Sequence, residues 1–124
     1  NLAKIEPTFL KSGTKDVVER VLRLGKSYFG DNIQLRCLKI DSPVGEAGGD
    51  LPFFAFVVSS KTEKLAVNRN LLKRRGGHII RELGDLKEPN TACVFFFKKG
   101  AVSLIFDKLK EQIVFLLKKA KLKE

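Results

Sequence analysis

The sequence predicts a single α+β domain in which helices pack on a small mixed sheet. Amphipathic segments of helical period lie near both ends and in the middle of the 124-residue chain, with short apolar or alternating segments between them. Hydrophobic residues make up 44% of the chain, which is enough for a core, and the length fits one domain over residues 1–124. We expect the order helix, two or three strands, helix, strand, helix.

The first helix is predicted over residues 14–24. Its valines and leucines share one arc, Thr14 is suited to cap it, and Gly25 is suited to end it. Strands are predicted next over residues 33–40, which alternate, and 53–60, which form an apolar run. The residues from 41 to 52 between them have the Gly, Pro and Asp content of a loop.

The second helix is predicted over residues 66–83 and has two different faces. Its apolar face consists of Leu72, Ile79, Ile80 and Leu83, and its basic face consists of Asn70, Lys73, Arg74 and Arg81. Gly76 projects from the apolar face and Gly77 from the basic face, which suits a tightly packed neighbour at the first and a close ligand backbone at the second. A kink or an early helix end at Gly76 is the alternative.

The last third of the chain predicts a strand and a helix. A turn at Glu88, Pro89 and Asn90 precedes an apolar strand, TACVFFFKK. Residues 103–120 then have a helical apolar stripe, made of Ile105, Phe106, Leu109, Ile113, Leu116, Leu117 and Ala120.

The charge of the chain indicates a polyanionic partner. The formal net charge is +10, and a net +6 of it lies between Lys61 and Arg81. Such a run can be a solvated helix face, but those faces usually mix signs, whereas this one repels itself unless a polyanion neutralises it. No apolar run is long enough to span a membrane, and no secretion signal is evident, so we expect a soluble cytoplasmic protein.

The chain is poor in residues for autonomous catalysis. His78 is the only histidine, and the carboxylates are scattered, so we expect neither a catalytic nor a metal site in the protein. Cys37 and Cys93 lie in apolar stretches and are predicted to be buried thiols, with a disulfide between neighbouring strands as the alternative.

The stretch AVNRNLLKR, residues 66–74, resembles the RNR motif of the bacterial ribonuclease P protein component, A-V-x-R-N-x-x-K-R. The likeness extends over about residues 9–120. It implies an α-β-β-β-α-β-α fold with a left-handed β-α-β crossover into the motif helix. It also implies a protein subunit that binds the catalytic RNA and the 5′ leader of precursor tRNA and assists removal of that leader, without an obligate protein partner. The chemistry then belongs to Mg²⁺ ions bound mainly by the RNA, and no organic cofactor is expected.

The resemblance also assigns residues to RNA binding. Arg69, Asn70, Lys73 and Arg74 match motif positions, and Ser60 and Lys61 match an S-K pair that precedes the crossover. Leu71 and Gly77 stand where the family has arginines. Arg75 and Arg81 are expected to compensate for them.

The leader cleft departs from the family more strongly. The family has two Phe and a Tyr whose rings contact single-stranded nucleotides, and the counterparts here are Val18, Leu22 and Arg36. Loss of ring stacking predicts weaker leader binding or a larger role for Arg36, Tyr28 and Phe29. Simple core packing of Val18 and Leu22 is the alternative.

Two other functions compete with a ribonuclease P subunit. A ribosomal or RNA-chaperone protein would share the charge but not the motif. A stand-alone nuclease would need His78 or a carboxylate cluster, and it would cleave RNA without a partner.

Overall fold

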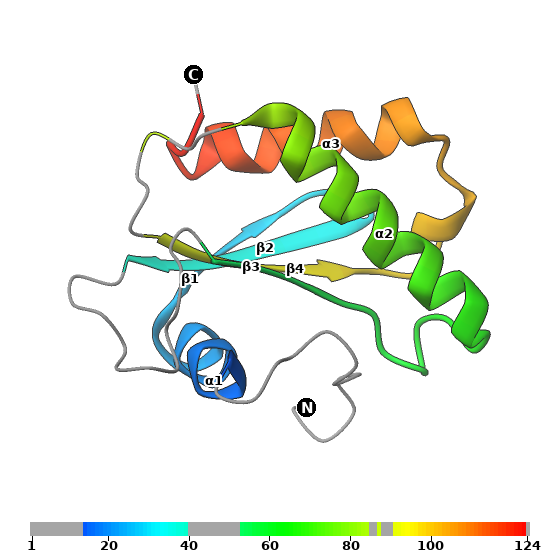
Figure 1. Ribbon diagram of the computed structural model, residues 1–124, viewed down its shortest axis with the longest axis horizontal. Helices are drawn as coiled ribbons and strands as arrows, with labels where there is room; N and C mark the ends of the chain where they lie inside the picture. The colour runs from blue at the N-terminus through cyan, green and yellow to red at the C-terminus, as the bar shows by residue number, and fades with distance from the viewer. Residues whose placement is uncertain (1–13, 40–52, 85–86, 88–90, 124) are drawn as a thin grey trace.

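A sheet separates one helix from two others in the described part of the molecule (Figure 1). The computed structural model describes residues 14–39, 53–84, 87 and 91–123. Their order agrees with the α-β-β-β-α-β-α order that the resemblance implied. The elements are α1 (Thr14–Leu24), β1 (Lys26–Phe29), β2 (Ile33–Lys39), β3 (Phe53–Val57), α2 (Ala66–Leu83), β4 (Thr91–Phe97), the 3₁₀ turn η4 (Ala101–Ser103) and α3 (Phe106–Lys119).

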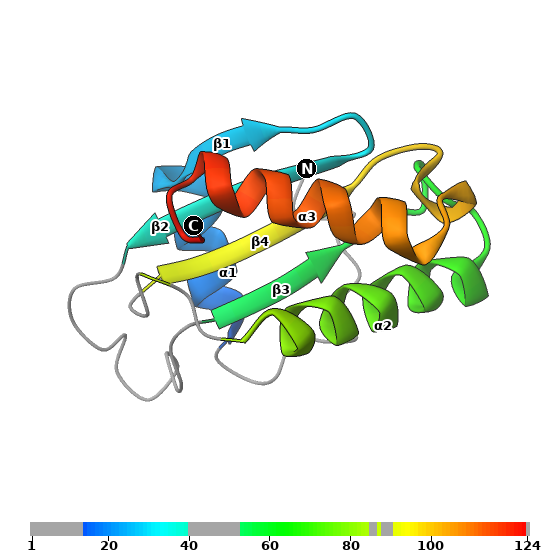
Figure 2. The same cartoon turned by 90° about the horizontal axis from the view of Figure 1, so that it is seen from above.

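The sheet is mixed, with strand order β1-β2-β4-β3. β1 pairs antiparallel with β2, β2 pairs antiparallel with β4, and β3 pairs parallel with β4. In Figure 2, β3 and β4 both run toward the right, and α2 lies on the viewer's side of the sheet. When the picture is turned so that these strands point upward, β4 lies to the left of β3. The β3-α2-β4 crossover is therefore left-handed, whereas nearly all such connections are right-handed.

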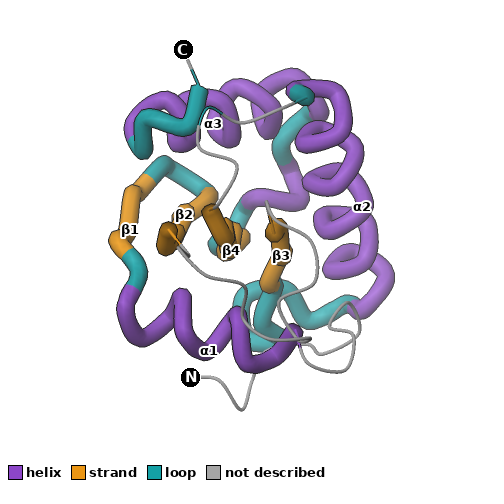
Figure 3. The backbone as a smooth tube through the Cα atoms, turned by 60° about the vertical axis from the view of Figure 1, so that its left-hand side comes forward, coloured by secondary structure: helices purple, strands orange, loops and turns teal. Residues whose placement is uncertain are grey.

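Each face of the sheet has its own apolar cluster. On one face, α1 buries Val17, Val18 and Val21 against side chains of β3 and β4. On the other face, α2 and α3 cover a larger cluster that includes Leu35, Phe95 and both helices' apolar residues. Figure 3 shows α1 on one side of the strands and α2 and α3 on the other. Burial on both faces explains the nearly continuous apolar run of β4.

Most predicted boundaries hold. Helix α1 ends as predicted, with the Gly25 N–H donating to the Val21 carbonyl at 2.8 Å. A Cβ at Gly25 would lie 2.5 Å from that oxygen, so the close approach requires glycine. The strand predicted over 53–60 ends at Val57, because Ser59 begins a turn. The predicted loop at 41–52 and turn at 88–90, like the side chain of Thr14, lie outside what the structure describes.

Helix α2 runs from Ala66 to Leu83 without a break at Gly76. A Cβ at Gly76 would lie 2.6 Å from the ring of Phe56, so the glycine lets α2 pack closely on β3. The predicted tight neighbour at this position is therefore confirmed, and the alternative of a kink is not observed. On the apolar face, Leu72 and Ile79 are buried and Ile80 and Leu83 are partly buried, as predicted.

Helix α3 begins at Phe106, three residues later than predicted, because Ala101–Ser103 form a 3₁₀ turn. Leu109, Ile113, Leu116 and Leu117 form the buried stripe. Ile105 was predicted to belong to that stripe, but it is the N-cap residue and is 65% exposed. No helix in the described ranges is both long and apolar enough to cross a membrane.

The cysteines pair in register across β2 and β4 as free thiols, so no disulfide joins these strands. Cys93 is buried as predicted, but Cys37 is only partly buried. Burial raises the pKa of both thiols, and the positive charge of Lys26 partly opposes this effect at Cys37.

Candidate nucleic-acid interface

The loop that joins β3 to α2 is held by short-range hydrogen bonds. The Ser59 hydroxyl accepts from the backbone N–H of Thr62 at 3.1 Å and donates to the Thr62 hydroxyl at 2.9 Å. Ser60 and Lys61 lie between these residues and are exposed. The S-K pair that the resemblance marked therefore sits at the tip of a defined turn that precedes α2.

Arg69, the first arginine of the motif, is bound to this loop. Its Nη1 donates to the backbone carbonyls of Glu63 and Lys64, each at 2.9 Å. The Glu63 carboxylate in turn accepts from the backbone N–H of Leu65 at 3.2 Å. Arg69 is only partly exposed, so it positions the loop at the N-terminus of α2 in addition to any RNA contact. The sequence motif predicted the contact but did not reveal this positioning role.

A basic surface does form along one side of α2 and the loop. Asn70, Arg74 and Arg81 are exposed on the helix, and Lys61 and Lys64 are exposed in the loop. These five residues are the α2 basic surface. The charges of its two lysines and two arginines face solvent, where phosphate groups can reach them.

Lys73 does not belong to the α2 basic surface. It was predicted on the basic face, but it is only 2% exposed. On the helix it lies about 100° from Arg74, on the side where α2 approaches β3, and it lines a groove with Ala55 of that strand. The prediction that Lys73 lies on the open basic face is wrong, because the sequence does not show how much of the surface of α2 is covered by β3.

Two further residues of α2 contact α3 or the segment before it, although the His78 side chain is 54% exposed. Arg75 is partly buried, and its Nη1 donates to the backbone carbonyl of Leu104 at 3.3 Å. The ring of His78 lies edge-on to the ring of Phe106, with 5.5 Å between centroids. Arg75 was predicted to replace a missing motif arginine, and the structure shows that it also ties α2 to the segment before α3.

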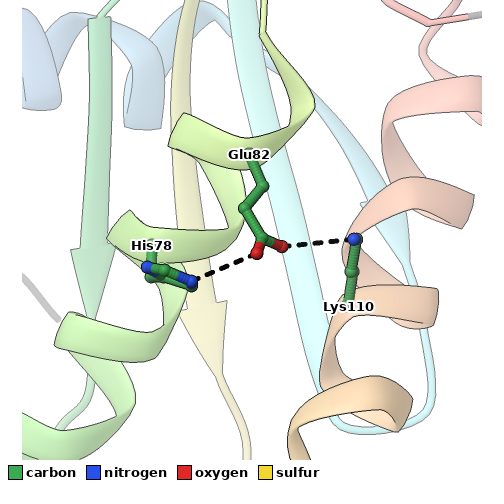
Figure 4. Close-up of polar contacts among 3 residues, drawn as sticks. All are labelled: His78, Glu82 and Lys110. Atoms are coloured by element: carbon green, nitrogen blue, oxygen red, sulfur yellow. Dashed lines mark hydrogen bonds and ion pairs between the residues drawn. The ribbon is translucent and has the colours of Figure 1, made fainter.

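Glu82 contacts His78, one turn earlier on α2, and Lys110 of α3, so the second contact joins the two helices (Figure 4). Its Oε2 lies 3.2 Å from His78 Nε2, and its Oε1 accepts from Lys110 Nζ at 3.2 Å. The hydrogen bond from Lys110 lowers the pKa of Glu82, assisted by the charges of Lys110 and His78. His78 was predicted to be structural or to contact phosphate, and these contacts give it a structural role.

A groove of about 660 Å³ runs along α2. Its described lining includes one lysine and three arginines but no carboxylate. The lining residues are Phe54, Ala55, Phe56, Leu71, Lys73, Arg74, Arg75, Gly77, His78, Arg81 and Phe106.

The predicted leader-cleft residues do not all meet. Val18 and Leu22 of α1 pack in the cluster on the α1 face, with Val18 only 2% exposed, so the alternative of core packing holds for Val18. Arg36 pairs with Val94 and shares that face. Tyr28 pairs with Leu35 and packs against the cluster on the opposite face. Placing Tyr28 with the other three was wrong, because strand residues alternate between faces.

Phe29 is the aromatic residue that the α1 face exposes at the edge of the sheet. It pairs with Gln34, which in turn pairs with Phe96, and Phe96 packs in the α1 cluster. Phe29 is 57% exposed, and Lys98 Nζ lies 5.1 Å from the centroid of its ring. The alternation of strand β1 was the signal that separates Phe29 from Tyr28, but the sequence did not predict that strand as a distinct element.

The described residues hold no group of three or more His, Cys, Asp or Glu side chains that could bind a metal ion.

Comparisons with known proteins agree on one family. The sequence profile of the Ribonuclease P family matches residues 13–121. A search of curated proteins finds no significant match. The fold is similar to that of the Staphylococcus aureus RNase P protein, with a TM-score of 0.69, 17% identity, and coverage of 88% of this chain and 93% of the other.

Two further structures are similar. The Thermotoga maritima RNase P protein has a TM-score of 0.68 and 22% identity, with coverage of 82% of this chain and 89% of the other. A mutant of the Staphylococcus aureus protein, described as defective in mRNA degradation activity, has a TM-score of 0.69 and 17% identity, with coverage of 86% and 83%. Because the family profile covers nearly all of the described fold, this chain belongs to the Ribonuclease P family of proteins.

Proposed function

We propose that this protein is the RNA-binding subunit of ribonuclease P and that it does not itself cleave RNA. Family membership makes it a component of that enzyme, active in tRNA processing together with ribonuclease P RNA. The observation that carries the proposal is the α2 basic surface, which is built on the family motif and is open to solvent. Its charges would neutralise phosphates of the RNA partner.

The arrangement of titratable groups supports a division of labour in which the RNA does the chemistry. His78 is held by Glu82, and Glu82 is also bound to Lys110. His78 Nε2 therefore contacts a carboxylate that also joins α2 to α3, which supports a structural role for this side chain. In this proposal Mg²⁺ is bound by the RNA, and no catalytic step is assigned to the protein.

A reconstitution assay tests this function. Purified protein, a bacterial ribonuclease P RNA, and the two together are incubated with precursor tRNA at low Mg²⁺. The expected result is cleavage at the 5′ end of the mature tRNA only when the RNA is present, with stimulation by the protein. A further arm offers an mRNA to the protein alone, because a relative is described by its mRNA degradation activity. Cleavage there would favour a stand-alone nuclease.

We further propose that the α1 face of the sheet binds the 5′ leader. Three features support this site. Phe29 offers an exposed ring beside Lys98, Leu22 is partly exposed, and Arg36 Nε is buried without a hydrogen-bond partner among the described residues. In Figure 1, α1 lies beneath one end of the sheet, and no described helix covers the rest of that face. Unstacked bases bind to such combinations of an aromatic ring and cations.

The leader proposal predicts a substrate-specific defect. Phe29→Ala should weaken holoenzyme binding of precursor tRNA, by about 1 to 3 kcal/mol if one base stacks on the ring, and should leave binding of leaderless tRNA unchanged. Phe115→Ala is a matched control, because Phe115 is 52% exposed on α3 and also has a lysine, Lys119, over its ring at 5.2 Å. An equal loss from both variants, or from both substrates, would contradict the leader site.

The cellular location follows from the same proposal. Precursor tRNA and the reducing conditions that keep Cys37 and Cys93 as thiols occur together in the cytoplasm. We therefore propose a cytoplasmic protein, which fractionation of cells that express a tagged chain would test.

A further inference from the structure

We propose that Gly77 is a point of close contact with the RNA, where the sugar–phosphate backbone crosses α2 between Arg74 and Arg81. This inference rests on the proposed function, since it assumes that the α2 basic surface binds RNA. It adds a backbone contact to the side-chain contacts that the motif implies. Gly77 itself is the residue that stands in place of a family arginine.

The fold gives no reason for a glycine at this position. A Cβ at Gly77 would meet one described group within 4 Å, Arg81 Nη1 at 3.6 Å, which is an ordinary contact. Its neighbour Gly76, by contrast, is required by the Phe56 ring at 2.6 Å. Gly77 has helical backbone conformation inside α2, where glycine is less favourable than alanine. Packing therefore explains Gly76 and leaves Gly77 unexplained.

The surroundings of Gly77 fit a phosphate-bearing chain. Arg74 precedes it by three residues and Arg81 follows it by four, so all three lie on the same side of the helix. The two arginines are exposed, and their Cα positions lie about 10 Å apart along the axis. The groove they line has no carboxylate among its described lining residues. A guanidinium on each side can bind phosphate while the bare helix backbone admits the ribose between them.

Substitution at Gly77 separates this contact from ordinary charge attraction. Gly77→Ala should leave the free energy of unfolding unchanged or higher, because alanine favours the helix. It should nevertheless lower the affinity for a bacterial ribonuclease P RNA by about an order of magnitude, because the added methyl group blocks close approach. The log–log salt slope should stay as in the wild type, whereas Arg74→Ala and Arg81→Ala should each reduce its magnitude by about one.

Two more variants sharpen the test. Gly77→Arg adds a positive charge but covers the helix backbone with a side chain, so we expect it to bind the RNA more weakly than the wild type. Gly77→Ala combined with Arg81→Ala should lose less affinity than the two single losses predict, because both changes disturb the same segment of RNA.

Three outcomes would overturn the inference. These are wild-type affinity in Gly77→Ala, tighter binding by Gly77→Arg, or a loss of affinity in Gly77→Ala that comes with lower helix content. Failure of the wild-type protein to bind the RNA would instead overturn the proposed function, and is therefore distinguishable from them.

Discussion

Arg69 Nη1 lies 2.9 Å from the backbone carbonyl oxygen of Glu63, six residues earlier in the chain, and also donates to the carbonyl of Lys64. One guanidinium thus fixes the loop through which β3 enters α2. The left-handed crossover begins at this loop. Arg69 is a motif residue expected to contact RNA, and it also fixes the loop that places the other motif residues on α2.

The first prediction contrasts Arg69 with Arg74. Arg69→Ala should lower the free energy of unfolding by about 1 kcal/mol, because two loop carbonyls lose their hydrogen bonds to the guanidinium. The loss is this small because solvent partly screens the charge of Arg69. Arg74→Ala should leave stability nearly unchanged, because the residue is exposed. Urea denaturation measures both. Equal stability of the two variants would show that the bonds of Arg69 do not hold the loop.

The second prediction concerns salt. The α2 basic surface has four exposed cations, so the log–log slope of RNA affinity against salt should be about −3 to −4. Arg74→Ala should reduce the magnitude by about one, because a phosphate contact is lost. Lys118→Ala, an exposed lysine on α3, serves as the control and should leave the slope unchanged. The reverse pattern would place the RNA on α3.

The third prediction concerns Gly76. A Cβ there would press on Phe56, so Gly76→Ala should lower the free energy of unfolding by about 1 to 3 kcal/mol despite the helix preference of alanine. Gly77→Ala is the matched control, because a Cβ there would make only an ordinary contact, with Arg81 Nη1 at 3.6 Å. Adding Phe56→Leu should recover part of the loss. Thermal unfolding of the single and double variants checks this, and no recovery would mean that the ring is not the obstacle.

The fourth prediction concerns the pKa of Glu82. The hydrogen bond from Lys110 lowers it in the folded protein, so the pair stabilises the fold above the pKa of an unfolded glutamate. That contribution is lost as the pH falls through the lower folded value. Lys110→Met should therefore raise the pKa of Glu82, as measured by NMR titration. Lys108→Met, whose partner is Glu111 at 3.4 Å, should leave it unchanged.

The fifth prediction concerns the thiols. Because burial raises the pKa of both, alkylation of the folded protein at neutral pH should be slow. Cys37 should react before Cys93, since it is partly exposed and Lys26 favours its thiolate. Mass spectrometry after timed iodoacetamide treatment distinguishes the two sites. Faster labelling of Cys93 would contradict the packing described for β4.

Local patterns predicted the elements well because periodicity reports which side of an element is buried. The bounds of α2 match the predicted 66–83, and the predicted close neighbour of Gly76 is the Phe56 ring. The handedness of the crossover came from the family resemblance alone, since a right-handed path would have the same periodicity.

The predictions that were wrong share a physical cause. Neighbouring elements in the fold decide which residues of a helix or strand are buried, and the sequence of that element alone does not show this. Lys73 lies on the basic side by helical angle but is covered where α2 approaches β3. Ile105 fits the stripe of α3 but precedes the helix and is exposed. Tyr28 and Phe29 are adjacent in sequence, and only the pairing of β1 with β2 shows which of them shares a face with Arg36.

The most direct test of the central claim is the rate of precursor tRNA cleavage at low Mg²⁺ with protein alone, bacterial ribonuclease P RNA alone, and both. We expect no cleavage by the protein, slow cleavage by the RNA, and a large increase when they are combined. Cleavage by the protein alone, or failure to stimulate the RNA, would contradict the account.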